Sequence, residues 1–174
     1  MGPVPVGRAR DMYLDGKGHM TVKVASLFPV VDATGEKMDR GSMMRYLSEM
    51  VWFPSALLGD NISFQAVDDR SARVSLTDHG RTATATMFFD GEGRLTDLVA
   101  KRHRILDESC DLETWSTPIT GYGEFEGVQI PIGAKALWKL AEGDDEYFDV
   151  TITDLRSDVW PDTMRPAAPL DRSA

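Results

Sequence analysis

From Ser63 onward, the chain is a succession of short segments in which apolar and polar residues alternate, and each segment ends in turn residues. In "SARVSLT", Ala72, Val74 and Leu76 alternate with polar side chains, and "TATATMFF" repeats the pattern in the next segment. A period of two residues is typical of a strand with one buried face. The turns "DHGR" and "DGEGR" join these segments into hairpins. The pattern therefore predicts a meander of antiparallel strands.

One segment before this meander has helical periodicity. Its main apolar face consists of Met43, Met44, Leu47, Met50 and Val51. We predict a helix from Asp39 to Phe53 that is capped by Asp39 or Ser42, with Pro54 either ending it or beginning a second short turn. The upstream stretch "HMTVKVASLFPVVDA" alternates as a strand does. Together these elements predict a mainly β (α+β) fold, a single curled antiparallel sheet or half-barrel of about seven to nine strands wrapped around one central helix.

Two further segments lack either period. The stretch "ILDESCDLETWSTP" breaks the alternation and is interpreted as a longer loop between strands. From Pro161 to the end the sequence shows no periodicity. A chain of 174 residues has the size of one domain. We therefore expect a single domain over residues 1–160 and a flexible C-terminal tail over residues 161–174.

Charge and hydropathy exclude several kinds of partner. The formal net charge is -9, and no run of lysines or arginines concentrates positive charge. Because phosphate contacts require clustered positive charge, we expect no nucleic-acid partner. No apolar stretch reaches the length of a membrane span, and the first residues lack a secretory signal. These features predict a cytoplasmic protein without a membrane span, and they are compatible with a homodimer.

The residue types that hold metals and cofactors are sparse. Cys110 is the only cysteine, so the chain cannot form an internal disulfide, and the three histidines are dispersed. The glycine patterns "GYGEFEG" and "DGEGR" lie between predicted strands, whereas a phosphate-binding loop leads into a helix. We therefore expect neither a metal site nor a cofactor.

A second stripe runs beside the apolar face of the predicted helix. Arg45, Glu49 and Trp52 lie at i, i+4 and i+7. The two charged residues can form a helix-surface ion pair worth about 0.2–0.5 kcal/mol, which requires no ligand. If the sheet covers this helix, both charges lose water, and buried ionisable groups in a cleft are enriched at functional sites. In that case Arg45 would bind an anionic group and Glu49 would act as a general base.

Other side chains are candidates for the same space. In "KRHR", alternation places Lys101 and His103 on one face of a strand and Arg102 and Arg104 on the other, and we expect the inner set to pair with helix carboxylates such as Glu49. His103 is a candidate catalytic residue together with Arg45 and Glu49. The candidate ligand-binding residues, each equally compatible with core packing, are Trp52, Tyr122, Trp138 and Met50.

Four motifs carry a resemblance to a known family. "RYLSEMVWFPSALL", "DDRSARVSLTDHG", "FFDGEGRLTDLVAKRHR" and "GYGEFEGVQIPIGAKALWKL" occur in this order and resemble a bacterial family of uncharacterised proteins over about residues 10–155. The layout of that family is similar to the half-barrel of lipoprotein carriers of the LolA type, which implies an apolar cavity between sheet and helices. The resemblance also implies additional sequence ahead of residue 1 in other members. If that segment closes the cavity, this chain is expected to have a more open site or another partner.

Three hypotheses for function follow. The first, which we favour, is a binding protein that holds a lipid or another small apolar molecule between sheet and helix. The second is a cofactor-independent isomerase, lyase or cyclase that uses Arg45 and Glu49, with His103 or Tyr122, on a mostly apolar substrate. The third is an interaction module whose sheet edge binds another protein. The first predicts a mainly apolar cavity, and the second predicts that the titratable groups converge on one pocket.

Overall fold

The computed structural model describes residues 7–24, 28–106 and 109–156. The elements in chain order are β1 (Gly7–Leu14), β2 (Lys17–Val24), β3 (Phe28–Ala33), α1 (Glu36–Glu49), the 3₁₀ turns η1 (Met50–Trp52) and η2 (Pro54–Leu58), β4 (Ile62–Asp68), β5 (Ser71–Asp78), β6 (Arg81–Phe89), β7 (Leu95–Leu106), β8 (Ser109–Ser116), β9 (Ile119–Phe125), β10 (Val128–Leu140) and β11 (Gly143–Thr151).

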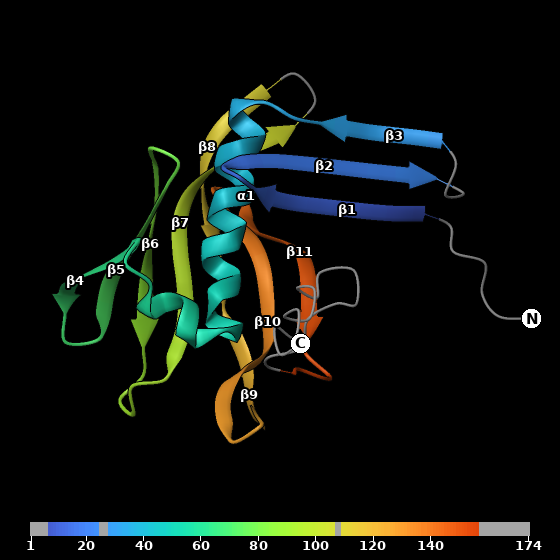
Figure 1. The fold of residues 1–174 in the computed structure, drawn as a ribbon. Helices are drawn as coiled ribbons and strands as arrows, with labels where there is room; N and C mark the ends of the chain where they lie inside the picture. Colours follow the sequence, from blue (N-terminus) through green and yellow to red (C-terminus); the bar gives the residue numbers. More distant parts are fainter. Residues whose placement is uncertain (1–6, 25–27, 107–108, 157–174) are drawn as a thin grey trace, which may run out of the picture.

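The strands from β4 onward form one antiparallel sheet that curls around α1 (Figure 1). Its order is β11-β10-β8-β7-β6-β5-β4, and β9 pairs with the first half of β10. This half-barrel around one helix confirms the predicted fold class. A second sheet, β1-β2-β3, is separate from the half-barrel and lies at the end of α1 where the helix begins (Figure 1). Of these three strands, β1 was not predicted, and β2 and β3 lie in and around the stretch that was predicted as a strand.

The core lies between the apolar face of α1 and the concave face of the sheet. The helix and η1 contribute Met43, Met44, Leu47 and Met50, which are buried as predicted. Val51, the fifth member of the predicted face, is half-buried. Every second residue of the facing strands completes the cluster, namely Val74, Leu76, Ala83, Ala85, Met87, Leu98, Ala100, Trp115 and Ala136. Four of these are alanines, whose small side chains let the helix backbone approach the sheet closely.

The start of α1 differs from the prediction. The helix begins at Glu36 with Gly35 at its N-cap, and no side chain caps it. Asp39 and Ser42, the predicted caps, lie inside the helix and are buried. The Asp39 backbone amide donates to the Gly35 carbonyl at 2.9 Å, so Asp39 is within the hydrogen-bonded helix. Its side chain does not cap the helix and contacts other elements instead. At the other end, α1 stops at Glu49 and is followed by η1, so the helix is shorter than the predicted end at Phe53. Pro54 begins the second short turn, η2.

Asp39 connects α1 to the N-terminal sheet and to the half-barrel. Its Oδ1 accepts a hydrogen bond from the Gly18 amide at 2.9 Å, and its Oδ2 accepts from Lys17 at 3.2 Å and from Arg81 at 3.1 Å. Gly18 has no room for a side chain, because a Cβ there would lie 2.5 Å from the Met38 carbonyl oxygen. The glycine thus lets β2 pack directly on the helix.

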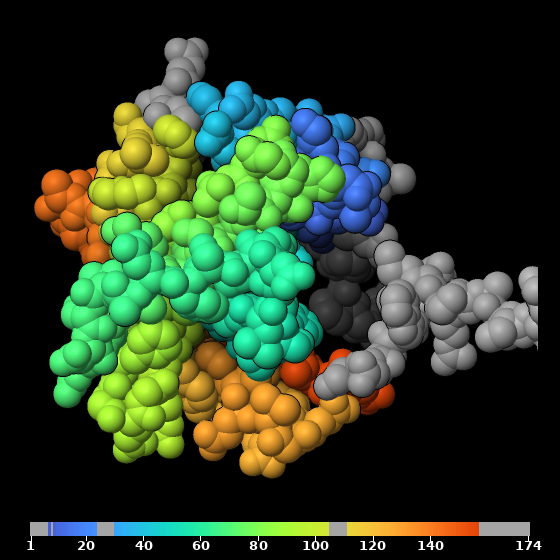
Figure 2. Space-filling view, turned by 60° about the vertical axis from the view of Figure 1, so that its left-hand side comes forward, coloured from blue at the N-terminus to red at the C-terminus, as the bar shows by residue number. Residues whose placement is uncertain are grey.

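A second set of contacts joins β1 and β2 to the turn between β5 and β6. The Tyr13 hydroxyl donates to Asp78 Oδ2 at 2.7 Å, and Arg81 Nη1 donates to the Gly16 carbonyl at 2.8 Å. Figure 2 shows this green turn against the blue strands β1 and β2. Because α1 contacts both sheets and these bonds link them, we propose that they belong to one domain, as expected for residues 1–160. The predicted tail, residues 161–174, lies outside the described residues.

The predicted loop at 105–118 is wrong. β7 continues to Leu106, and β8 occupies Ser109–Ser116, in register with β7 and, through its last residues, with β10. Acidic residues are disfavoured in strands, so Asp111 and Glu113 hid the alternation that would have predicted a strand here. Only Trp115 and Ser116 of β8 are buried among its described side chains.

Across the described ranges, no helix is long and apolar enough to cross a membrane.

Candidate functional site

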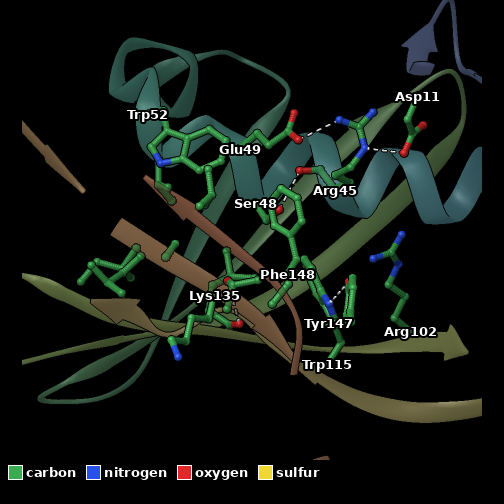
Figure 3. Close-up of a pocket in the computed structure, with 18 of the residues that line it drawn as sticks. Asp11, Arg45, Ser48, Glu49, Trp52, Arg102, Trp115, Lys135, Tyr147 and Phe148 are labelled. Atoms are coloured by element: carbon green, nitrogen blue, oxygen red, sulfur yellow. Dashed lines mark hydrogen bonds and ion pairs between the residues drawn. The ribbon is translucent and has the colours of Figure 1, made fainter. Parts of the chain in front are cut away.

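A pocket of about 460 Å³ lies between the last turns of α1 and the β7–β11 side of the sheet (Figure 3). Its walls come from α1 and η1, from β1 and β2, and from the concave face of the half-barrel. Most of the lining is apolar, and the members are Asp11, Met20, Arg45, Ser48, Glu49, Val51, Trp52, Leu95, Leu98, Arg102, Trp115, Thr117, Ile119, Ala134, Lys135, Ala136, Tyr147, Phe148 and Val150. The predicted stripe of Arg45, Glu49 and Trp52 therefore borders a hollow.

Arg45 is held by two carboxylates at the polar end of this pocket. Its Nη1 donates to Glu49 Oε1 at 2.7 Å, and its Nε lies 2.9 Å from Asp11 Oδ2. The Arg45 Nε–H bond does not point toward Asp11 Oδ2, so Arg45 and Asp11 form an ion pair without an aligned hydrogen bond. Ser42 also donates to Asp11, at 3.2 Å. The helix pair predicted from i, i+4 spacing is thus part of a larger cluster that reaches β1.

The electrostatics of this cluster favour a charged guanidinium. Burial lowers the pKa of Arg45, but the hydrogen bond and charge of Glu49 and the charge of Asp11 outweigh it, so the pKa is raised above its ordinary value. Arg45 is 25% exposed, which leaves the pair only partly screened by water. Two carboxylates around one guanidinium give the cluster one net negative charge.

The opposite wall is aromatic. Trp115 of β8 is buried, and its indole donates to the Tyr147 hydroxyl at 2.8 Å. Tyr147 also stacks on Trp138, with ring centroids 6.1 Å apart. Tyr147 and Phe148 of β11 are about half exposed although they line the pocket. Their exposure places the mouth of the pocket along β11.

The basic residues of β7 divide as alternation predicted. Arg102 and Arg104 are half-buried, whereas Lys101 and His103 are exposed. The inner set does not pair with helix carboxylates, contrary to expectation. Arg104 pairs with Asp145 of β11, and the Arg102 guanidinium lies 5.0 Å from the centre of the Trp115 ring. The twist of the sheet brings β11, rather than α1, within reach of Arg104.

The remaining candidates lie outside this pocket. His103 borders a separate hollow of about 220 Å³ beside the first turns of α1. Tyr122 borders another hollow near η2, and its hydroxyl donates to the Leu95 carbonyl at 2.8 Å. Burial raises the pKa of the Tyr122 phenol. Met50 belongs to the core, and Trp138 packs against the same cluster. Of the three proposed catalytic residues, the pocket brings together Arg45 and Glu49.

Sequence reasoning missed several residues of this site. Asp11 lies in a strand that was not predicted, 34 positions before Arg45, so no local spacing could reveal the contact. Tyr147 and Phe148 are neighbours in β11, and a β-bulge at Tyr147 shifts the pairing of this strand with Ala136 and Leu137 of β10. Alternation alone cannot predict which aromatic side chain then faces the concave side.

No metal-ligating arrangement accompanies the pocket. Within the described ranges, no three side chains of histidine, cysteine, aspartate or glutamate come together in a group that could hold a metal ion. The charged groups at the pocket are instead two arginines, one lysine and two carboxylates. Their chemistry is suited to ion pairing and hydrogen bonding with an organic molecule.

Comparisons with known proteins give a family and no function. No curated protein matches the chain, and no solved structure matches it. One family matches residues 1–150, which include α1, the pocket-lining part of the half-barrel and the N-terminal sheet. The chain therefore belongs to DUF6544, a family of unknown function.

Proposed function

We propose that this protein binds a small, mainly apolar molecule in the pocket between α1 and the β7–β11 side of the sheet. The observation that carries the proposal is the pocket itself, which has a volume of about 460 Å³ and walls of mostly apolar side chains. Small-molecule sites typically measure about 300–1,000 Å³ and combine apolar walls with a few polar groups. The hollow at α1 fits this description.

The packing around the pocket supports the proposal. Leu47 and Met50 are buried in the core beside the pocket, so the hollow adjoins residues that are shielded from solvent. Ala134 and Ala136 of β10 form the pocket floor, and their small side chains leave space that larger side chains would fill. A pocket maintained beside a close-packed core implies that an apolar occupant replaces the missing side-chain contacts. Apolar burial contributes about 25 cal/mol per Å² of surface removed from water.

A substitution that fills the pocket tests the proposal. Ala134→Phe places a ring on the pocket floor, so we expect Nile red, an uncharged apolar dye, to lose about tenfold or more in affinity. Ala66→Phe on β4 is the matched control, since Ala66 is exposed and lies outside the pocket. Dye fluorescence gives the affinities, and thermal melting by circular dichroism verifies the folds. Equal dye affinities for two folded variants would contradict the proposal.

Native mass spectrometry of protein from its own host gives a second test. The expected result is a retained small molecule in the unsubstituted protein and its loss in the Ala134→Phe variant. A mass equal to the bare chain, together with no dye binding, would argue against a binding function.

A further inference from the structure

Arg102 lies at the same end of the pocket as Asp11 and Arg45, on the side away from Trp52 (Figure 3). It projects from β7 toward α1. A Cβ built at Gly41 would lie 3.7 Å from Arg102 Nη2, so the guanidinium reaches the helix surface one turn before Arg45. Gly41, Arg45 and Glu49 share this face of the helix, because they are four residues apart. Arg102 therefore reaches the polar end of the pocket from the sheet.

This guanidinium has no acidic partner among the described residues. Its one recorded interaction is with the face of Trp115, at 5.0 Å from the ring centre. Glu113 lies opposite Arg102 in the β7–β8 register, yet the two side chains form no ion pair within the described part of the chain. Within the described ranges, the N–H groups of the Arg102 guanidinium donate to no protein acceptor and are available to solvent or to a ligand. An arginine has five such donors in a planar fork that matches a carboxylate.

The other half-buried arginines of the half-barrel and its helix differ. Arg45 pairs with Asp11 and Glu49, Arg81 pairs with Asp39, and Arg104 pairs with Asp145. Those guanidinium groups are neutralised within the protein, as is usual for partly buried charge. Arg102 is the exception: among the described residues it has no ion-pair partner, and it borders both this pocket and the hollow beside His103.

The carboxylates of the pocket do not offer an equivalent site for a cation. Asp11 is engaged by Arg45 and Ser42, and Glu49 is engaged by Arg45. With Arg102 included, the polar end contains two positive and two negative charges, and only the Arg102 charge lacks a partner. An anionic group placed there gains a charge-assisted, two-point contact without displacing an existing pair.

We infer that the ligand is an anionic amphiphile whose carboxylate binds Arg102 and whose apolar body lies along Leu98, Ile119 and Val150 toward the mouth. This inference deepens the proposed function and depends on it. The Trp115 ring supports the guanidinium from below, so the head group is held between Arg102 and the helix end of the pocket. A bidentate carboxylate fixes the orientation, whereas the apolar wall supplies most of the contact area.

Three probes with the same chain and different heads test the inference. Dodecanoate is anionic, dodecanol is neutral, and dodecylamine is cationic at mildly alkaline pH. We expect dodecanoate to bind the unsubstituted protein about tenfold more tightly than dodecanol, a ratio that corresponds to about 1.4 kcal/mol. Displacement of Nile red, with each probe below its micelle concentration, gives the affinities. Dodecanol or dodecylamine binding as tightly as dodecanoate would overturn the inference but leave the proposed function standing.

Two variants assign the preference to Arg102. Arg102→Gln should reduce the dodecanoate-to-dodecanol ratio to about one, while dodecanol affinity changes little. Arg73→Gln is the control, because Arg73 is exposed on the other face of β5 and its loss changes the net charge equally. Gly41→Asp should act similarly to Arg102→Gln, since it places a carboxylate beside the guanidinium. An unchanged ratio in a folded Arg102→Gln or Gly41→Asp protein would refute the assignment. If no probe of any charge binds, the proposed function itself fails.

Discussion

Replacement of Asp39 by asparagine tests whether the buried carboxylate holds the two sheets together. Asp39 is 2% exposed and accepts hydrogen bonds from Gly18, Lys17 and Arg81. In Asp39→Asn the amide oxygen can still accept from the Gly18 amide, which isolates the loss of charge. The amide group would then place its N–H atoms beside Arg81, a donor that needs an acceptor. The substitution therefore removes one buried ion pair without removing the side-chain volume.

The loss of stability expected for Asp39→Asn follows from the exposure of its two charged partners. Lys17 is 71% exposed, so water already screens its contact and its loss matters little. Arg81 is 24% exposed, and losing a hydrogen bond to a charged group costs about 1.5–3 kcal/mol. We expect a loss of about 2–3 kcal/mol in the free energy of unfolding. For a chain of this size that corresponds to a fall of roughly 4–12 °C in Tm.

The pH dependence gives an independent check. The Gly18 amide, with Lys17 and Arg81, holds the pKa of Asp39 below its ordinary value against the opposing effect of burial. The folded state thus keeps the carboxylate ionised, and its contribution is full above the unfolded pKa of about 3.9 and is lost as the pH falls further. The Tm difference between the two proteins should shrink in acid. Glu36→Gln, which alters an exposed pair with Arg40, is the control.

Urea unfolding at neutral pH and thermal melting across the acid range measure both effects. A folded Asp39→Asn protein with the same free energy of unfolding as the unsubstituted chain would refute the reasoning, and so would a Tm difference that persists in strong acid. A fall as large for Glu36→Gln would show that charge loss anywhere on α1 is sufficient.

The remaining predictions concern the core, one tyrosine and the pocket. Leu47→Asp should abolish cooperative folding, because Leu47 is fully buried and its replacement introduces an unpaired charge; a cooperative thermal melt would contradict this. Burial, with the hydrogen bond to Asp78, raises the Tyr13 pKa to about 12. The free energy of unfolding should therefore fall as the pH rises from 10 toward 12. In alkaline melting experiments, Tyr13→Phe should reduce that loss. Glu49→Gln should retain the fold and bind dodecanoate at least as tightly as the unsubstituted protein, since it removes a negative charge near the head group. A tenfold loss of dodecanoate affinity, measured by dye displacement, would favour the acid–base hypothesis instead.

The parts of the fold that could be predicted are those in which burial follows a local period. The alternation in β5 and β6 is visible because one face packs on α1 along their length. In β8 the same period is hidden, since the strand buries little and carries Asp111 and Glu113. The sheet β1-β2-β3 was recognised only in part, because its residues are mostly exposed and Arg10 and Asp11 interrupt the apolar pattern.

The candidate site could be predicted only where its residues share one element. Arg45, Glu49 and Trp52 lie on one side of a helix, so their spacing placed them together. Asp11 reaches Arg45 from a different sheet, and this contact depends on how the sheets pack. Arg102 was correctly assigned to a face opposite His103, but its lack of an acidic partner among the described residues depends on how other elements pack around it.

The two ends of the pocket are supported in different ways. β7 is paired on both sides within the sheet, and α1 is anchored by the core and by Asp39, whereas β11 pairs only with β10 among the described strands. An outward displacement of β11 would disturb one ladder, but the same displacement of β7 would disturb two. The strand that contains Arg102 is therefore held by two ladders and the strand that contains Phe148 by one. For a ligand bound as proposed, we expect strict selection of the chemical group at Arg102 and tolerance of differences in the length and branching of the part that extends toward the mouth.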